Sequence, residues 1–275
     1  MKLGINPFYF KNAGVGEQPR SEKECIDVVK AAGFSKLDVS TADRSTAEGM
    51  AGYIMERGME VIQSHLPFNR YGKANMEQHA EIQMQYAENA RIMGSKILVA
   101  HGDEFDFDNM TYTPEAALEY NYALFSPIVE FAAGNGMKVA FENVFQDLDP
   151  VKRPRNCSLV EELCALVDRF GTDTVGICWD SGHAKVQYGE ENLAALSIAG
   201  SRVIATHIHD NYYKRDLHLF PFMGQMDWVG FMKMLRQIGY QGNFSFEIGY
   251  NKIPKALAAE YLALLHKSGE YLLSL

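Results

Sequence analysis

Residues 174–184 read TVGICWDSGHA, and this stretch contains the pattern that decides the fold. An apolar run over 175–179 ends abruptly on Asp180, and His183 follows after two small residues. A strand with so little alternation between apolar and polar residues is typical of a parallel sheet that is covered on both faces. The stretch therefore predicts a buried parallel strand whose carboxyl end carries polar side chains.

Seven other segments resemble this strand in length and composition, and a segment with helical spacing of its apolar residues follows each strand. The predicted strands cover 2–6, 36–40, 60–64, 96–100, 138–142, 174–180, 202–208 and 243–248. The predicted helices cover 21–32, 45–57, 76–93, 114–133, 158–170, 190–199, 228–238 and 255–273. Eight such pairs predict an α/β fold, a single (β/α)8 TIM barrel that forms one domain over residues 1–275, with a doubly wound sheet as the alternative.

The composition restricts the partners and the compartment. The chain has 26 Lys and Arg against 35 Asp and Glu, a net charge of −9, and the two signs are interspersed. We therefore expect no nucleic acid as a partner, because affinity for DNA depends on clustered basic residues. No apolar run approaches the roughly 20 residues that cross a bilayer, which argues against a membrane protein. Four scattered cysteines without CxxC spacing predict reduced thiols and a cytoplasmic location.

Imidazoles and carboxylates stand at the ends of the last six predicted strands. In chain order they are His65, His101, Glu142, Asp180, His207 together with His209, and Glu247. The carboxyl ends of the strands of such a barrel form one rim, and function gathers there. Carboxylates that crowd one cavity repel each other unless a cation lies among them. This ring therefore predicts a site for one divalent metal ion.

The minimal set of metal ligands predicted from this ring is Glu142, Asp180, His207 and Glu247. Carboxylates mixed with imidazole suit Mn²⁺, Mg²⁺, Co²⁺ or Zn²⁺, and manganese is the preferred expectation. Two alternatives stay open. Asp180 could serve only as a cap for the helix that follows it. His209 could point away from the side that His207 faces, because residues two apart share a face only in a regular strand.

Five short motifs carry a resemblance to a known family. They are FEN at 141–143, WDSGHA at 179–184, HIHDN at 207–211, DLH at 216–218 and FEIGY at 246–250. In this order they resemble the xylose isomerase-like TIM-barrel superfamily, which contains sugar and sugar-phosphate isomerases, epimerases and endonuclease IV. The resemblance extends over nearly the whole chain.

The resemblance implies a role for each matching residue. Glu142, Asp180, His207 and Glu247 would hold one divalent metal, the two glutamates would also act as catalytic acid and base, and His183 would contact a substrate oxygen. The expected protein is an enzyme of carbohydrate metabolism, a metal-dependent isomerase or epimerase of a sugar or sugar phosphate that works through an enediolate. Further residues expected at the substrate are His65, His101, His209, Asp216, His218 and the aromatic Phe8.

Three other functions stay open. All nine residues that match the trinuclear zinc site of endonuclease IV are present, which allows a phosphodiesterase on abasic DNA, although the acidic balance favours a carbohydrate. The enediolate could instead expel a leaving group, as in a sugar dehydratase or lyase. A barrel that binds a sugar without converting it is the third possibility.

Two smaller features concern partners. The basic residues Arg153, Arg155, Lys214 and Arg215 follow predicted strands, where they could bind an anionic group of a substrate or simply be solvated. The apolar end of the last predicted helix, EYLLSL at 270–275, is compatible with a homo-oligomer.

Overall fold

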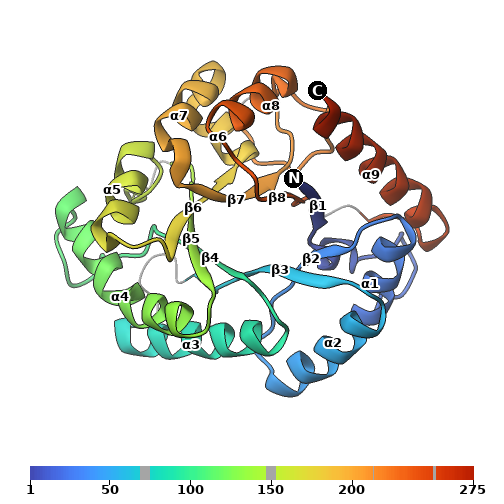
Figure 1. Cartoon of the computed structure of the whole chain (residues 1–275), viewed down its shortest axis with the longest axis horizontal. Coiled ribbons are helices and arrows are strands. Elements are labelled where there is room, and N and C mark those ends of the chain that lie inside the picture. Colours follow the sequence, from blue (N-terminus) through green and yellow to red (C-terminus); the bar gives the residue numbers. More distant parts are fainter. Residues whose placement is uncertain (69–74, 147–152, 213, 250–251) are drawn as a thin grey trace.

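The structure, a computed structural model, describes residues 1–68, 75–146, 153–212, 214–249 and 252–275. Eight parallel strands form a closed barrel in chain order, and Figure 1 shows the helices surrounding it on the outside. The strands are β1 (Lys2–Ile5), β2 (Lys36–Asp38), β3 (Glu60–His65), β4 (Ile97–His101), β5 (Lys138–Glu142), β6 (Val175–Asp180), β7 (Val203–Ile208) and β8 (Asn243–Phe246). The predicted (β/α)8 barrel is confirmed, and the doubly wound alternative is wrong because β8 pairs with β1 and closes the sheet.

The described residues form nine α-helices, one more than predicted. They are α1 (Glu22–Ala31), α2 (Arg44–Glu56), α3 (Met76–Ile92), α4 (Pro114–Gly134), α5 (Val160–Phe170), α6 (Ser181–Tyr188), α7 (Asn192–Ala199), α8 (Trp228–Gln237) and α9 (Ala258–Ser274). The unpredicted helix is α6, which begins directly at the end of β6. The Asp180 side chain accepts a hydrogen bond from the backbone N–H of His183 at 2.6 Å and so caps this helix.

Strand register brings the carboxyl ends of neighbouring strands to one height. His101 of β4 pairs with Glu142 of β5. Asp180 of β6 pairs with His207 of β7. Since the strands are parallel, all these residues lie at the same rim of the barrel.

A layer of small apolar side chains fills the barrel beneath this rim. Val99, Ala140, Cys178 and Ala205 form a separate buried cluster, apart from the main core between the strands and the helices. Each of the four stands two positions before a polar residue of the rim, and residues two apart on a strand share a face. His101, Glu142, Asp180 and His207 therefore point into the barrel, above the layer.

The structure bears on two sequence expectations, the reduced state of the cysteines and the absence of a membrane-spanning segment. All four cysteines are buried and free, as predicted for reduced thiols. None of the helices in the described part of the chain combines the length and the apolarity needed to cross a membrane.

Candidate metal centre

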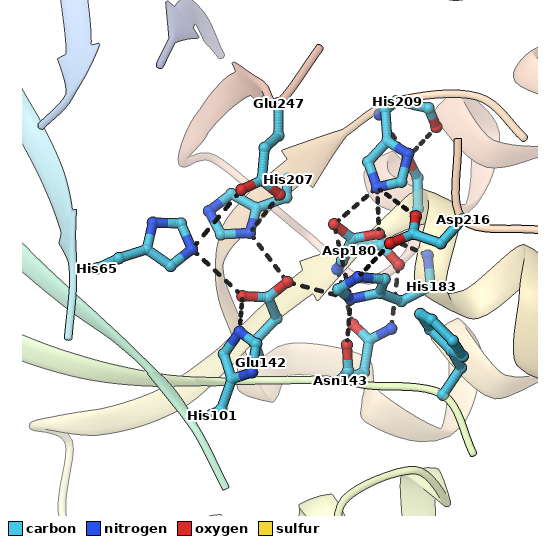
Figure 2. Close-up of polar contacts among 12 residues, drawn as sticks. His65, His101, Glu142, Asn143, Asp180, His183, His207, His209, Asp216 and Glu247 are labelled. Carbon is cyan, nitrogen blue, oxygen red and sulfur yellow. Dashed lines mark hydrogen bonds and ion pairs between the residues drawn. The ribbon is translucent and has the colours of Figure 1, made fainter. Parts of the chain in front are cut away.

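The four predicted metal ligands converge on one point at the rim. Glu142 ends β5, Asp180 ends β6, His207 lies near the end of β7 and Glu247 directly follows β8. One ligand atom from each residue lies within 4.8 Å of the others, and all four side chains are buried. Figure 2 shows these residues pointing toward one another from different strands.

Glu142 is at the middle of the cluster, where four imidazoles surround its carboxylate. Oε2 lies 3.5 Å from His65 Nε2 and 3.4 Å from His101 Nε2. Oε1 lies 3.2 Å from His183 Nδ1 and 3.2 Å from His207 Nδ1. Burial alone would raise the pKa of Glu142, but the charge of His207 and hydrogen bonds from His101 and His183 hold this pKa well below its ordinary value.

Asp180 both caps α6 and faces the cluster, so the two sequence alternatives for it are compatible. It is completely buried, and Nε2 of His209 lies 2.9 Å from Oδ1 and 3.0 Å from Oδ2. Asn143 fixes its backbone, since Oδ1 of Asn143 accepts a hydrogen bond from the Asp180 N–H at 2.7 Å. Burial would raise the pKa of Asp180, but the charges of His183 and His209 lower it.

The motifs WDSGHA and HIHDN pack against each other at Gly182, where the His209 ring lies against the glycine. A methyl group at Gly182 would overlap ring atoms of His209, so only glycine leaves room for this imidazole against Asp180. Ser181 Oγ accepts from the His209 N–H at 3.0 Å and donates to the His209 carbonyl at 2.8 Å. His209 therefore supports Asp180 from behind, and it is completely buried.

A second cluster of polar side chains lies beside the four predicted metal ligands. Its ligand atoms come from His183, His209, Asp216 and His218, again within 4.8 Å of one another. Asp216 Oδ2 lies 3.2 Å from His218 Nε2 and 3.6 Å from His183 Nε2. Burial would raise the pKa of Asp216, but hydrogen bonds from these two imidazoles hold it far below its ordinary value. The pKa of His218 is raised to about 9, because Asp216 and other acidic neighbours outweigh its burial.

Asp210 positions the loop that carries Asp216 and His218. This fully buried carboxylate accepts hydrogen bonds from the backbone N–H groups of Phe222 and Met226 and from the Trp228 indole, at 3.0 to 3.1 Å. The buried side chain of Asp210 thereby connects the end of the loop to the end of β7 through hydrogen bonds.

A cavity of about 550 Å³ opens above the metal centre. Of the predicted substrate residues, the cavity is lined by His65, His101, His183, Asp216, His218 and Phe8. His209 is not part of the lining, so its predicted substrate contact does not agree with its position behind Asp180. Glu142 and Glu247 line the cavity, whereas Asp180 and His207 lie deeper.

Of the four basic residues singled out in the sequence, only Arg155 lines this cavity. Its Nε donates to Asp103 Oδ2 at 2.6 Å and its Nη1 donates to the Phe145 carbonyl at 3.0 Å. Arg153 instead lies near the exposed Asp108, at 3.4 Å. Arg155 is therefore the basic residue of the set that a bound substrate could reach.

Two side-chain contacts at the site were not predicted from the sequence. Asp38 ends β2 and lies 3.3 Å from both His65 Nδ1 and His207 Nε2. The predicted strand extended to residue 40, which placed Asp38 in its middle, whereas the strand of the structure ends at Asp38. The Tyr9 hydroxyl donates a hydrogen bond to Glu247 Oε1 at 2.5 Å, and no sequence pattern indicates a contact across 238 residues.

The residues of the cluster fit a divalent cation. Several buried polar atoms have no hydrogen-bond partner of regular geometry among the described residues: Glu142 Oε2, His101 Nδ1, His207 Nδ1 and His209 Nδ1. Buried polar groups are rarely left so, and a bound ion is one common reason. Carboxylate oxygens with imidazole nitrogens are a donor set that Mn²⁺, Co²⁺ and Zn²⁺ accept.

Comparisons with known proteins agree with this architecture. The family described as "Xylose isomerase-like TIM barrel" matches residues 26–268. The uncharacterized protein y4fM of Sinorhizobium fredii (strain NBRC 101917 / NGR234) is 24% identical over 257 residues, which is 82% of this chain and 80% of that protein.

Solved structures with the same fold cover essentially the whole chain. A D-tagatose 3-epimerase-like protein has a TM-score of 0.78 at 22% identity, over 100% of this chain and 98% of that one. D-psicose 3-epimerase in the presence of D-fructose has a TM-score of 0.78 at 15% identity, over 99% of both chains. The IOLI protein with a bound zinc atom has a TM-score of 0.75 at 17% identity, over 100% and 98%. At these identities the likeness shows a common fold.

Proposed function

The chain belongs to the xylose isomerase-like TIM-barrel family, and from this premise we propose that it is a divalent-metal-dependent isomerase or epimerase of a sugar or sugar phosphate. The observation that carries the proposal is the pair of glutamates at the cavity floor. His207 Nδ1 lies 3.2 Å from Glu142 and 3.5 Å from Glu247, so the two carboxylates flank one point. A protein that only bound a sugar would have no need for two such carboxylates around a metal centre.

In this proposal Glu142, Asp180, His207 and Glu247 hold the metal. When bound, a divalent ion supplies polarisation of a substrate carbonyl and the neighbouring hydroxyl oxygen, which lowers the cost of enediolate charge. One glutamate takes the proton from the carbon next to the carbonyl and the other returns a proton. Return on the opposite face gives an epimer, and return to the neighbouring carbon on the same face gives aldose–ketose isomerisation.

The cavity walls suit a sugar that is held above this floor. His65, His183 and His218 line the cavity and add polar imidazole groups to its wall. Phe8, Phe68 and Phe145 supply apolar faces that can pack on sugar C–H groups and exclude water. The D-tagatose 3-epimerase-like protein and D-psicose 3-epimerase, which share this fold, support a carbohydrate as the substrate class.

The test has two stages. Protein purified without chelator is first assayed for metal content per chain, where about one manganese, cobalt, magnesium or zinc is expected. The loaded protein is then incubated in D₂O with a panel of ketoses and their phosphates. Deuterium at a carbon next to the carbonyl, in a product of unchanged composition, would establish isomerase or epimerase chemistry. Loss of water or of an aglycone would instead identify a lyase, and a protein that binds no metal after reconstitution would overturn the proposal.

A second candidate function has one specific observation in its favour. Three of the four groups of described side chains able to hold an ion lie side by side at this rim. They are His65, His101 and Glu142; Glu142, Asp180, His207 and Glu247; and His183, His209, Asp216 and His218. They contain all nine residues that match the zinc site of endonuclease IV. Close to three zinc ions per chain, together with cleavage of an abasic DNA duplex, would favour this function. The net charge of −9 counts against it.

The finer attributes of the protein are proposals too. Manganese is the metal we expect at the centre, on the basis of the carboxylate-rich ligand set. A cytoplasmic location is supported by four buried free cysteines. A single domain over residues 1–275 and assembly into a homo-oligomer complete the proposal.

A further inference from the structure

Asp38 is a buried carboxylate that faces two imidazoles of the metal centre at once. It is the last residue of β2, and it is 1% exposed. Its oxygens lie 3.3 and 3.4 Å from Nδ1 of His65, and Oδ2 lies 3.3 Å from Nε2 of His207. The two rings are stacked, with centroids 4.5 Å apart and planes inclined by 17°. One carboxylate thus meets one nitrogen of each ring.

The other nitrogen of each ring faces the two glutamates. His65 Nε2 lies 3.5 Å from Glu142 Oε2 and 3.9 Å from Glu247 Oε1. His207 Nδ1 lies 3.2 Å from Glu142 Oε1 and 3.5 Å from Glu247 Oε2. Both imidazoles therefore bridge Asp38 on one side and the glutamate pair on the other.

We propose that Asp38 is a positioning residue that, in the metal-loaded protein, holds His65 and His207 in opposite tautomers, with the proton on Nδ1 of His65 and on Nε2 of His207. A neutral imidazole has one N–H donor and one acceptor nitrogen, and an ionised carboxylate can only accept. The nitrogen beside Asp38 therefore carries the proton, and the lone pairs of His65 Nε2 and His207 Nδ1 point at the glutamates. The inference rests on the metal centre of the proposed function, but not on which reaction occurs there.

The surroundings of Asp38 favour this role over direct metal ligation. Its Oδ2 also accepts a hydrogen bond from Gln63 Nε2 at 3.1 Å, so protein donors already occupy this carboxylate. Carboxylates behind metal-bound histidines fix the orientation and basicity of the ring, and their loss weakens metal binding by roughly 10–100-fold. Asp38, His65 and His207 could also hold an ion by themselves, and the stoichiometry measured below tests that arrangement.

The first test compares Asp38→Asn with wild type by titration of the metal-free proteins with Co²⁺. We expect the variant to bind Co²⁺ roughly 10–100-fold more weakly at unchanged stoichiometry, with an altered visible absorption spectrum, because an amide cannot orient both rings. The control is Glu104→Gln, the same kind of change in a buried carboxylate that lies 3.2 Å from Nε2 of His79 and does not line the cavity. Affinity and spectrum of the control should be those of wild type.

Two results would overturn the inference from this test. Unchanged Co²⁺ affinity and spectrum in Asp38→Asn would mean that Asp38 does not position the rings. Loss of one whole Co²⁺ equivalent would mean that Asp38 is itself a ligand. Because the readouts are affinity and absorption, they are independent of whether the protein proves to be an isomerase.

The second test uses only the wild-type protein, so it does not depend on folding of a variant. Long-range ¹H–¹⁵N spectra of the zinc-loaded protein report which ring nitrogen of each histidine carries a proton. We expect Nδ1–H for His65 and Nε2–H for His207, two different tautomers facing one carboxylate. The same tautomer in both rings would contradict the inference.

Discussion

The ends of β5 and β8 carry the same side chain in different surroundings. Glu142, at the end of β5, is 1% exposed and has four imidazoles within 3.5 Å. Glu247, directly after β8, is 5% exposed and accepts a hydrogen bond from the Tyr9 hydroxyl at 2.5 Å. Both carboxylates line the cavity and both face His207.

This difference indicates a division of work between the two glutamates. The imidazoles around Glu142 hold its pKa well below the ordinary value, which makes a good anionic ligand and a weak base. Glu247 has fewer basic neighbours and a hydroxyl partner at the side of the cavity. We therefore expect Glu142 to matter first for metal binding and Glu247 to matter first for turnover.

The largest effect is expected for Glu142→Gln. The carboxylate shared by four imidazoles disappears, so metal affinity should fall by more than the roughly 100-fold seen for outer partners, and deuterium exchange should become undetectable. Metal content after dialysis measures this directly. The matched control is Glu104→Gln, the same change in a buried carboxylate that lies 3.2 Å from His79 away from the centre. If Glu142→Gln kept its full metal content, Glu142 would not be the glutamate that matters first for metal binding.

The next effect is expected for Glu247→Gln. Turnover should fall by about 10²–10⁴-fold, which is the usual contribution of a general acid or base. Metal should still bind, since Glu142, Asp180 and His207 remain. Measuring deuterium exchange and metal affinity on the same samples separates the two roles. If this variant lost metal as completely as Glu142→Gln, the two glutamates would be equivalent.

A smaller effect is expected for Tyr9→Phe. Hydrogen bonds to charged groups contribute about 1.5–3 kcal/mol, so losing this one should lower kcat by about 10- to 150-fold. Metal affinity should fall much less than in Glu142→Gln, because all four ligands remain. Tyr53→Phe is the matched control, because Tyr53 donates a similar hydrogen bond to Asp27, at 2.7 Å, on the surface. If kcat of Tyr9→Phe equals that of wild type, the hydrogen bond from Tyr9 does not orient Glu247 for catalysis.

The smallest effect concerns stability as a function of pH. Acidic neighbours raise the pKa of His65 to about 10 and that of His218 to about 9, against the tendency of burial to lower both. Their charged forms therefore stabilise the metal-free protein fully below pH 6.5, and this contribution is lost as pH rises through 9 to 10. A metal replaces these protons, so it binds better as pH rises. The Tm difference between loaded and metal-free protein should widen from pH 6 to pH 9, and a constant difference would contradict this.

The sequence predicted the barrel and the ring of its rim because both rest on local patterns. Apolar runs such as 175–179 identify strands, and the residue that ends each run is readable without any tertiary information. The four predicted metal ligands are together in the structure, and their role stays a prediction. The sequence identified Asp180 as a possible helix cap, but it placed the next helix at 190–199 and not directly after Asp180, where α6 begins.

The sequence alone determined where the strands lie along the chain and which polar residues end six of them, since periodicity and strand ends are properties of a few adjacent residues. Only the tertiary structure decided which atoms meet. The contact of Asp38 with His65 and His207, the hydrogen bond from Tyr9 to Glu247, and the position of His209 behind Asp180 all join different strands or loops. Such contacts depend on strand register and on closure of the sheet between β1 and β8, which no local pattern specifies.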